Sequence, residues 1–221
     1  MYTSLKRLFD LIVSLICILI VAPFFIFIWI LIKADSPKDP TIYKGKRASM
    51  NAGIFYLYKF RTMVVDAESL GGYSTAIDDP RLTKLGKLLR KFKIDEIPQL
   101  LNVIRGEMSL VGPRPQVTFY TDKYTLEQKQ ILKVKPGITD ISSLLFIDMD
   151  KTLGNVDVDE VYEAKIEPVK NKLRLEYANN ASFGLDLVIL VVTFIRIFGL
   201  NELNARKIIL FFYPNLDLET R

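Results

Sequence analysis

Residues 11–32 have the sequence LIVSLICILIVAPFFIFIWILI, a run of 22 residues without a charged side chain. As a straight helix this run would be about 33 Å long at ~1.5 Å per residue, enough to cross a hydrocarbon core of ~30 Å. Pro23 follows Ala22 in the middle of the run, and a proline inside a helix removes a hydrogen bond and kinks the helix. The run therefore predicts either a kinked helix that spans a membrane or a re-entrant helix that bends back to the face it entered.

Basic residues flank this run on both sides, with Lys6 and Arg7 before it and Lys33 after it. The positive-inside rule therefore gives no direction for a spanning helix. The rule is satisfied if both ends stay in the cytoplasm and the chain turns at Ala22 and Pro23. A cleaved signal peptide is disfavoured, because the run is longer than the usual apolar segment and no small-x-small site follows it.

The composition of the chain excludes several classes of site. The 221 residues contain 30 Lys plus Arg against 25 Asp plus Glu, a formal net charge of +5, with no histidine and one cysteine. Without histidine there is no Ser-His-Asp or Cys-His catalysis and no imidazole metal site. One cysteine allows neither an intrachain disulfide nor a thiolate zinc cluster. Any chemistry must use carboxylates, Lys, Arg, Tyr, Ser or Thr, and any metal would be a hard ion held by oxygen atoms.

The sequence after the apolar run predicts a domain with more helix than strand. Short β-branched and aromatic segments at 42–43 and 54–60 predict strands. Apolar residues spaced three and four apart predict helices over 82–92 and 97–104. Gly106 is placed to end the second of these helices.

Four later segments are also predicted to be helical. The segments 126–133 and 161–178 have helical spacing, and the alternating charges of the second are expected on a solvated face. The segment 182–200 is apolar but contains one acidic and one basic residue, which favours an amphipathic helix at a membrane surface over a second span. The short apolar segment 207–213 suits the same position. The residues therefore predict an α-rich α/β domain that lies against a bilayer.

Two basic residues of the segment YKFRTM, residues 58–63, are candidates for substrate binding. On a strand, Lys59 and Arg61 would point to the same face and present two adjacent cations. An ordinary solvated strand edge would have the same pattern, so the segment alone does not decide between these interpretations.

Adjacent acids open the segment DEIPQL, residues 95–100. Pro98 is tolerated in the first turn of a helix, which places Asp95 at or near the N-cap. A purely structural interpretation is available, in which Asp95 caps the helix and Glu96 favours the helix dipole.

The segment MSLVGPRP, residues 108–115, predicts a rigid loop. Gly112 allows an unusual turn, and Pro113 and Pro115 lock the backbone on either side of Arg114. A planar guanidinium on such a loop suits bidentate binding of phosphate. Together with the nearby acids and the apolar run, this loop predicts a phosphorylated substrate that is met at a lipid surface.

The chain resembles the bacterial sugar transferases, and more specifically the small monotopic phosphoglycosyl transferases. The resemblance covers nearly the whole chain apart from about the last twenty residues. It is carried by KRLFD at 6–10, the apolar run with Pro23, YKFRTM at 58–63, LTKLGKLLRKFKIDEIPQLLNVIRGEMSLVGPRP at 82–115, KPGIT at 135–139 and NNASFGLDL at 179–187.

This resemblance implies an α-rich α/β (α+β) monotopic membrane protein with small sheet elements and amphipathic interfacial helices. Residues 1–34 would form a re-entrant membrane helix, broken at Ala22 and Pro23. The family often has Ser before this proline, so the break here rests more on Pro23. Residues 35–200 would form the catalytic domain on the cytoplasmic face of a bacterial inner membrane, and residues 201–221 would form a C-terminal tail.

The resemblance also implies an activity. Such an enzyme transfers a sugar-1-phosphate from a nucleoside diphosphate sugar, usually a uridine one, to polyprenyl phosphate and releases UMP, which initiates a surface glycan or polysaccharide pathway. The nucleophile falls on Asp95 and the adjacent acid on Glu96, with Mg²⁺ close to both. The basic positions for substrate phosphates fall on Lys59, Arg61, Arg90 and Arg114. The resemblance allows a homo-oligomer and gives no reason to expect a nucleic-acid partner.

The chain departs from many relatives after Thr139. Residues 140–146 read DISSLLF, and Ile147 stands where one branch of the family usually has Arg. This loop belongs to the half that we assign to nucleotide-sugar recognition, so the sugar stays open, as does the choice between a metal-binding and an orienting Glu96.

Two other functional classes stay open. A glycosyltransferase that moves only the sugar would release UDP in place of UMP. A membrane scaffold or nucleic-acid-binding module using the net charge of +5 would show no dependence on Mg²⁺.

Overall fold

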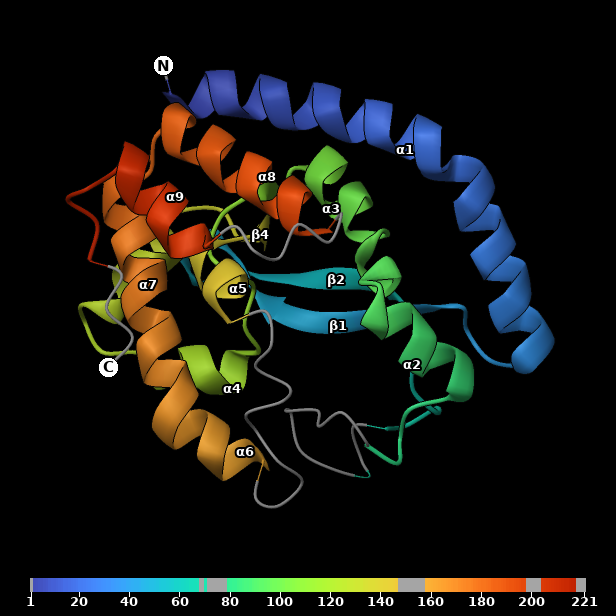
Figure 1. Cartoon of the computed structure of the whole chain (residues 1–221). Helices are drawn as coiled ribbons and strands as arrows, with labels where there is room; N and C mark the ends of the chain where they lie inside the picture. The colour runs from blue at the N-terminus through green and yellow to red at the C-terminus, as the bar shows by residue number, and fades with distance from the viewer. Residues whose placement is uncertain (1, 68–69, 71–78, 147–157, 198–203, 218–221) are drawn as a thin grey trace.

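The structure is a computed structural model that describes residues 2–67, 70, 79–146, 158–197 and 204–217 (Figure 1). One long N-terminal helix lies along a domain built from two small sheets and several shorter helices. The described elements of the first half are α1 (Tyr2–Asp35), β1 (Ile42–Ala48), η1 (Met50–Ala52), β2 (Ile54–Phe60), α2 (Lys84–Lys91), η2 (Ile94–Glu96), α3 (Gln99–Arg105) and β3 (Ser109–Val111). Those of the second half are α4 (Thr118–Thr121), η3 (Gln128–Lys133), β4 (Gly137–Thr139), α5 (Ile141–Leu145), α6 (Val158–Val161), η5 (Tyr162–Ile166), α7 (Glu167–Asn180), α8 (Phe183–Ile197) and α9 (Ala205–Phe212).

Helix α1 bends along its length, and both of its ends lie against the same domain (Figure 1). Pro23 lies inside the helix and gives a physical cause for the bend. Near the N-terminus, Arg7 donates to the carbonyl oxygens of Val103 at 2.5 Å and Ile104 at 2.8 Å. Near the other end, Ile28 and other apolar side chains of α1 pack against Phe60 and Leu89.

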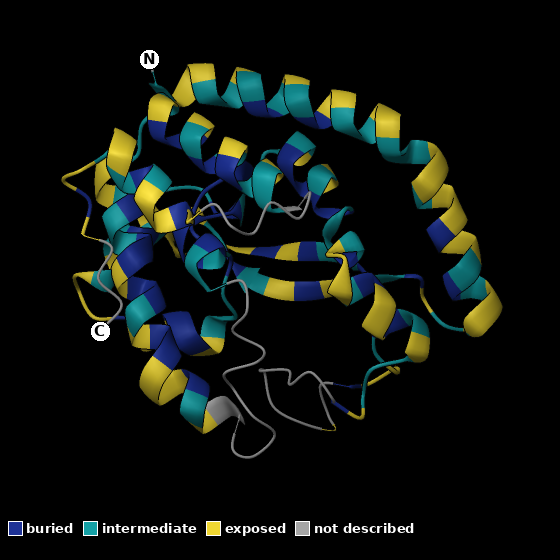
Figure 2. Ribbon diagram, viewed as in Figure 1, coloured by how far each residue is buried: buried dark blue, intermediate teal, exposed yellow. Residues whose placement is uncertain are grey.

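The middle of α1 exposes its apolar side chains. Leu19 is 76% exposed and Ile20 72% exposed, and the outward face of the helix is largely exposed in Figure 2. Of the described helices, α1 alone is long and apolar enough to cross a membrane, and 11% of its most apolar window is buried. A core helix of a soluble protein would be mostly buried, so α1 points to membrane association.

The predicted strands form an antiparallel hairpin. β1 pairs with β2 in a register that places Tyr43 opposite Lys59. The first strand begins where the sequence predicts but continues to Ala48, because the backbone of its later residues also pairs with β2. A second sheet contains only β3 and β4, which run parallel with Ser109 opposite Gly137. The strand β3 falls in the segment 108–115 that was predicted as a rigid loop, and β4 falls in the segment 135–139, for which no strand was predicted.

Most predicted helices are present with changed bounds. The segment 82–92 forms α2, whose N-cap Thr83 accepts a hydrogen bond from the Gly86 N–H at 2.8 Å. Gly106 ends α3 in the left-handed region, at φ 81°, as predicted. The segment 126–133 forms only the 3₁₀ helix η3. The predicted helix 182–200 is described to Ile197, and its last three residues lie outside the described residues.

The prediction of a solvated charged face on the helix at 161–178 is only partly right, because Glu163, Lys165 and Lys172 are exposed but other charged residues are not. Glu167, Lys170 and Arg174 of α7 are buried, with exposures of 5%, 6% and 1%. These side chains form a polar layer inside the domain, and their contacts are described with the site below.

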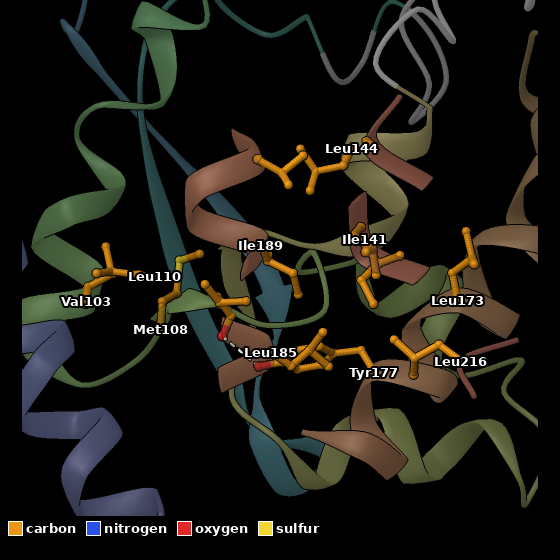
Figure 3. Packing of buried hydrophobic residues seen from close by; sticks show 14 of the residues in the cluster. Val103, Met108, Leu110, Ile141, Leu144, Leu173, Tyr177, Leu185, Ile189 and Leu216 are labelled. Atoms are coloured by element: carbon orange, nitrogen blue, oxygen red, sulfur yellow. Dashed lines mark hydrogen bonds between the residues drawn. The ribbon is translucent and has the colours of Figure 1, made fainter. Parts of the chain in front are cut away.

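The main hydrophobic core joins α3, β3, α5, α7, α8 and α9 (Figure 3). Tyr177 from α7 lies in this core and its hydroxyl donates to the Val111 carbonyl oxygen at 3.3 Å. Ala205 and Ile209 of α9 belong to the same cluster. The core therefore fixes α7 and the end of β3, and the loop that carries Arg114 follows directly from β3.

Candidate active site

Asp95 lies in the short turn η2 between α2 and α3. Lys93, at φ 56°, turns the chain after α2, and the N-cap of α3 is Pro98. The Asp95 side chain is buried, and its Oδ1 atom has no hydrogen-bond partner among the described residues. The interpretation of Asp95 as a structural cap is therefore wrong. A buried polar atom without a partner costs free energy, so this atom is a candidate to contact a substrate.

Glu96 is held by two cations that come from distant parts of the chain. Lys59 of β2 donates to Glu96 Oε1 at 2.8 Å. Arg114 donates from NH1 to Oε2 at 3.2 Å and from NH2 to Oε1. Burial would raise the pKa of Glu96, but Arg114 and Lys59 together hold it well below its usual value. Glu96 is therefore a fixed carboxylate whose two oxygens are both engaged.

The pKa values of the two adjacent acids are thus shifted in opposite directions. Burial raises the pKa of Asp95, and the charge of Glu96 raises it further, while Lys59 and Arg90 act against this shift. Lys59 Nζ is 3.9 Å from Asp95 Oδ2 but 2.8 Å from Glu96. Burial lowers the pKa of Lys59, which Glu96 opposes. One carboxylate oxygen of Asp95 therefore remains available to a substrate, whereas both oxygens of Glu96 are engaged.

The Arg114 loop is positioned by the small parallel sheet. The Gly137 N–H donates to the Pro113 carbonyl oxygen at 3.0 Å, and the Arg114 N–H donates to Asp140 Oδ2 at 3.2 Å. A Cβ atom at Gly112 would overlap the Lys135 carbonyl oxygen. The predicted reason for this glycine, an unusual backbone turn, is wrong, because among the described glycines only Gly106 has a positive φ. Gly112 is needed for close approach of two backbones.

The remaining predicted cations have different surroundings. Arg90 of α2 donates from Nε to Thr62 Oγ1 at 3.0 Å, and its charge acts on Asp95. Arg61 instead donates to the carbonyl oxygens of Pro40 at 2.8 Å and Met63 at 3.2 Å. The predicted pair of adjacent cations at Lys59 and Arg61 is therefore not formed. Arg61 follows the last residue of β2, so the alternation of a strand no longer sets its direction.

A comparison with protein families shows to which family the chain belongs. Residues 1–199 match the family model described as bacterial sugar transferase. The chain belongs to the bacterial sugar transferase family. It is therefore an enzyme, a transferase, and the resemblance found in its sequence is confirmed.

Three relatives illustrate the range of this sugar transferase family. EpsL of Bacillus subtilis (strain 168), named an uncharacterized sugar transferase, is 40% identical over 191 residues, which cover 86% of this chain and 85% of EpsL. The UDP-glucose:undecaprenyl-phosphate glucose-1-phosphate transferase of Klebsiella pneumoniae is 36% identical over 85% of this chain but only 39% of its own length. The undecaprenyl-phosphate galactose phosphotransferase of Salmonella typhimurium is 36% identical over 61% of this chain and 31% of its own length.

Two polar residues of this sugar transferase were not predicted to support the site. Asn102 of α3 is fully buried, donates to the Tyr56 carbonyl oxygen at 2.8 Å and accepts from the Tyr58 N–H at 3.0 Å. It thereby fixes β2, which carries Lys59, against α3. Gln99 is 1% exposed, and neither polar atom of its amide has a partner among the described residues. Both residues were visible in the sequence as polar positions within an apolar helix.

The site fits a magnesium ion in part. No group of three or more acidic, histidine or cysteine side chains that could hold a metal occurs among the described residues. Mg²⁺ in phosphate chemistry commonly needs only one or two carboxylates, with substrate phosphates and water as the other ligands. The unpartnered Oδ1 of Asp95 could be such a ligand. Glu96 is engaged through both oxygens, which favours an orienting role for it.

Proposed function

We propose that this enzyme transfers a sugar-1-phosphate from a uridine diphosphate sugar to polyprenyl phosphate, with release of UMP. The proposal is carried by one observation: the buried Asp95 has an unpartnered carboxylate oxygen beside a Glu96 that two cations hold in place. The names of the relatives support the acceptor and the donor, since one is a UDP-glucose:undecaprenyl-phosphate glucose-1-phosphate transferase. The reaction would initiate a surface glycan or polysaccharide.

The first step is attack by an Asp95 carboxylate oxygen on the β-phosphorus of the donor. The new oxygen–phosphorus bond forms as the bond between this phosphorus and the bridging oxygen breaks, and the electron pair leaves with UMP. The product is an aspartyl phosphosugar, a mixed anhydride. In the second step an oxygen of polyprenyl phosphate attacks the same phosphorus, and the carboxylate of Asp95 is regenerated.

Two steps avoid bringing two phosphorylated substrates together. Like charges ~4 Å apart repel by about 4 kcal/mol at an effective dielectric constant of ~20. A covalent intermediate lets each substrate approach the enzyme separately. UMP leaves before the lipid phosphate reacts, so the kinetics are ping-pong.

The surrounding side chains support this chemistry. Arg114 uses N–H groups of its fork to hold Glu96, and its remaining donors suit the oxygens of the transferring phosphoryl group. Lys59 and Arg90 place positive charge around Asp95. Magnesium bound at Asp95 would supply charge screening between the carboxylate and the donor phosphates.

We also propose that α1 is re-entrant and places the site at the cytoplasmic face of the inner membrane. Support comes from the two ends of α1, which both pack against the catalytic domain while the apolar middle is exposed. Single cysteines at Ser4 and Lys38, in a chain with Cys17 replaced by Ser, should label with an impermeant reagent from the cytoplasmic side only. Labelling from opposite sides would mean a spanning helix.

The activity is tested by product analysis. The purified enzyme is incubated with Mg²⁺, polyprenyl phosphate and each member of a panel of UDP sugars. We expect UMP with one donor and a polyprenyl diphosphate sugar in equal amount. Release of UDP would identify a transferase of the sugar alone and would overturn the proposal.

A further inference from the structure

Lys170 of α7 is a buried residue whose ammonium group has no hydrogen-bonding partner in the described part of the chain. The residue is 6% exposed, and no hydrogen bond or ion pair joins its Nζ atom to another described residue. Two aromatic rings lie near it: Nζ is 5.8 Å from the ring centre of Phe146 and 5.5 Å from that of Tyr162. The charges of Asp140 and Glu167 act on this ammonium group, but neither carboxylate bonds it directly, so its donors are available to a ligand.

The other charged groups of this layer do have partners. Arg174 donates from NH1 to Glu167 Oε1 at 3.1 Å and to Asn171 Oδ1 at 2.8 Å. Asp140 accepts from the Ser142 hydroxyl at 2.7 Å and from the Arg114 N–H at 3.2 Å. Apart from the Nε atom of Arg174, these charged groups have hydrogen-bonding partners, whereas the ammonium group of Lys170 contacts only aromatic rings among the described residues.

Arg114 connects Lys170 to the active site. Its guanidinium holds Glu96 and its N–H donates to Asp140. Burial lowers the pKa of Lys170 to about 7, with Arg174 and Arg114 contributing to this shift and Asp140 opposing it. Lys170 therefore lies near Asp140, which Arg114 contacts directly, so a phosphate bound at Arg114 would be near the ammonium group.

We infer that Lys170 is a donor-binding residue, whose ammonium group binds a phosphate oxygen of the nucleotide sugar on the far side of Arg114 from Asp95. This inference rests on the proposed function. The donor is favoured over the lipid phosphate by position. Figure 1 shows α7 on the opposite side of the β1–β2 hairpin from the second half of the apolar helix α1, the helix that we propose contacts the membrane.

Replacement of Lys170 by Met tests this inference with two measurements, the affinity for UDP and the Tm. UDP serves as the probe, and its affinity for the purified full-length enzyme is measured by calorimetry with Mg²⁺ present. Hydrogen bonds to charged groups contribute enough that we expect the affinity to fall by about tenfold to hundredfold. The Tm of the ligand-free enzyme should rise or stay level, because a buried charge without a hydrogen-bonding partner has been replaced by an apolar side chain only one atom shorter.

Lys172→Met is the matched control. Lys172 lies on the same helix, is half-exposed and pairs with Asp217 at 2.8 Å, so its loss should leave UDP affinity unchanged. Lys170→Arg should recover part of the affinity, because it restores the charge. A structural role for Lys170 would instead lower the Tm of Lys170→Met and leave UDP affinity as in the wild type, and that result would overturn the inference.

Steady-state kinetics separate this inference from the proposed function. With a donor that supports UMP release, Lys170→Met should raise KM for the donor and leave KM for polyprenyl phosphate unchanged. If the wild type releases UMP and the variant has unchanged values for UDP affinity and donor KM, the inference alone is wrong. If the wild type releases no UMP with any donor and yet binds UDP through Lys170, the proposed function is wrong and the phosphate-binding role of Lys170 is supported.

Discussion

Two buried polar clusters differ in the charge that each leaves without a partner. The acid cluster consists of Lys59, Asp95, Glu96 and Arg114, and the α7 cluster consists of Asp140, Glu167, Lys170 and Arg174. In the first, one buried oxygen of Asp95 is unpartnered, whereas in the second the ammonium group of the buried Lys170 has only aromatic rings as direct contacts among the described residues. Arg114 belongs to the acid cluster and also donates from its backbone N–H to Asp140 of the α7 cluster. The difference fits the two proposed roles, in which Asp95 attacks phosphorus and Lys170 binds a phosphate oxygen.

The acid cluster is tested most strongly by Asp95→Asn. An amide cannot attack phosphorus, so turnover should fall by about a thousandfold or more. The fold should persist, because Asn has the same size and the only ion pair lost among the described residues is the long one with Lys59, at 3.9 Å. UMP release and far-UV circular dichroism measure the two effects.

Asp122→Asn is the control for this change, since it makes the same substitution at an exposed position. Near-normal activity in Asp95→Asn would remove Asp95 from the nucleophile role. Equal activity loss in the control would mean that the assay reports something other than the acid cluster.

Arg114→Lys tests the residue that joins the two clusters. Lysine is a single point charge and cannot contact both oxygens of Glu96 as the guanidinium does. We expect kcat/KM for the donor to fall by about tenfold to hundredfold, the scale of losing a charge-assisted bond. The matched change Arg206→Lys, at an exposed position of α9, should have no effect. Activity within twofold of the wild type in Arg114→Lys would leave the loop with only a structural role.

The smallest expected effect is a pH dependence of stability that belongs to the α7 cluster. The pKa of Lys170 is about 7 in the folded enzyme against a usual value of 10.5. The unfolded chain therefore binds more protons between these values, and this group destabilises the fold most near or below pH 7 and progressively less as the pH rises. The charged and titratable groups facing it, which remain in the variant, are Arg114, Asp140, Tyr162, Glu167 and Arg174.

The measurement is the difference in Tm between Lys170→Met and the wild type, taken without ligand from pH 6.5 to pH 9. We expect the variant's advantage to be largest at the lowest pH and to shrink as the pH rises, because deprotonation relieves the wild type. An advantage that grows with pH would contradict a buried, uncompensated ammonium.

The acid cluster could be largely predicted from the sequence because its parts lie in local motifs. Asp95 and Glu96 are adjacent, and Pro98 and the prolines around Arg114 constrain the backbone near them. The contacts between these parts could not be predicted, since Lys59 reaches Glu96 across 37 positions. The direction of Arg61 was mispredicted because the strand ends one residue before it.

The α7 cluster was missed although the sequence contains a signal for it. Buried Ile166, Leu173 and Tyr177 form an apolar stripe with helical spacing, and Lys170 lies four residues after the first and three before the second. A lysine within such a stripe is expected to face the core. The alternating charges of the segment favoured a solvated face instead, and only the packing of α7 against α5 and the Arg114 loop reveals the burial.

The strands β3 and β4 were missed for a different reason. Each has three residues, too few for a periodic pattern, and each is preceded or followed by Gly and Pro, which usually mark loops. Their pairing depends on the close approach of Gly112 and Gly137, which is a property of two distant segments. The long apolar run was by contrast predictable from the sequence, and the structure adds that α1 bends and that both of its ends pack against the domain.

The central claim is that Asp95 carries the phosphosugar during turnover, and intact-protein mass spectrometry tests it most directly. The enzyme is mixed with Mg²⁺ and its donor in the absence of polyprenyl phosphate and then quenched. We predict a mass gain of one sugar phosphate on the peptide that contains Asp95, together with one equivalent of UMP, and neither in Asp95→Asn. If the wild type never gains this mass and UMP appears only after the lipid is added, the two substrates react directly and the claim is wrong.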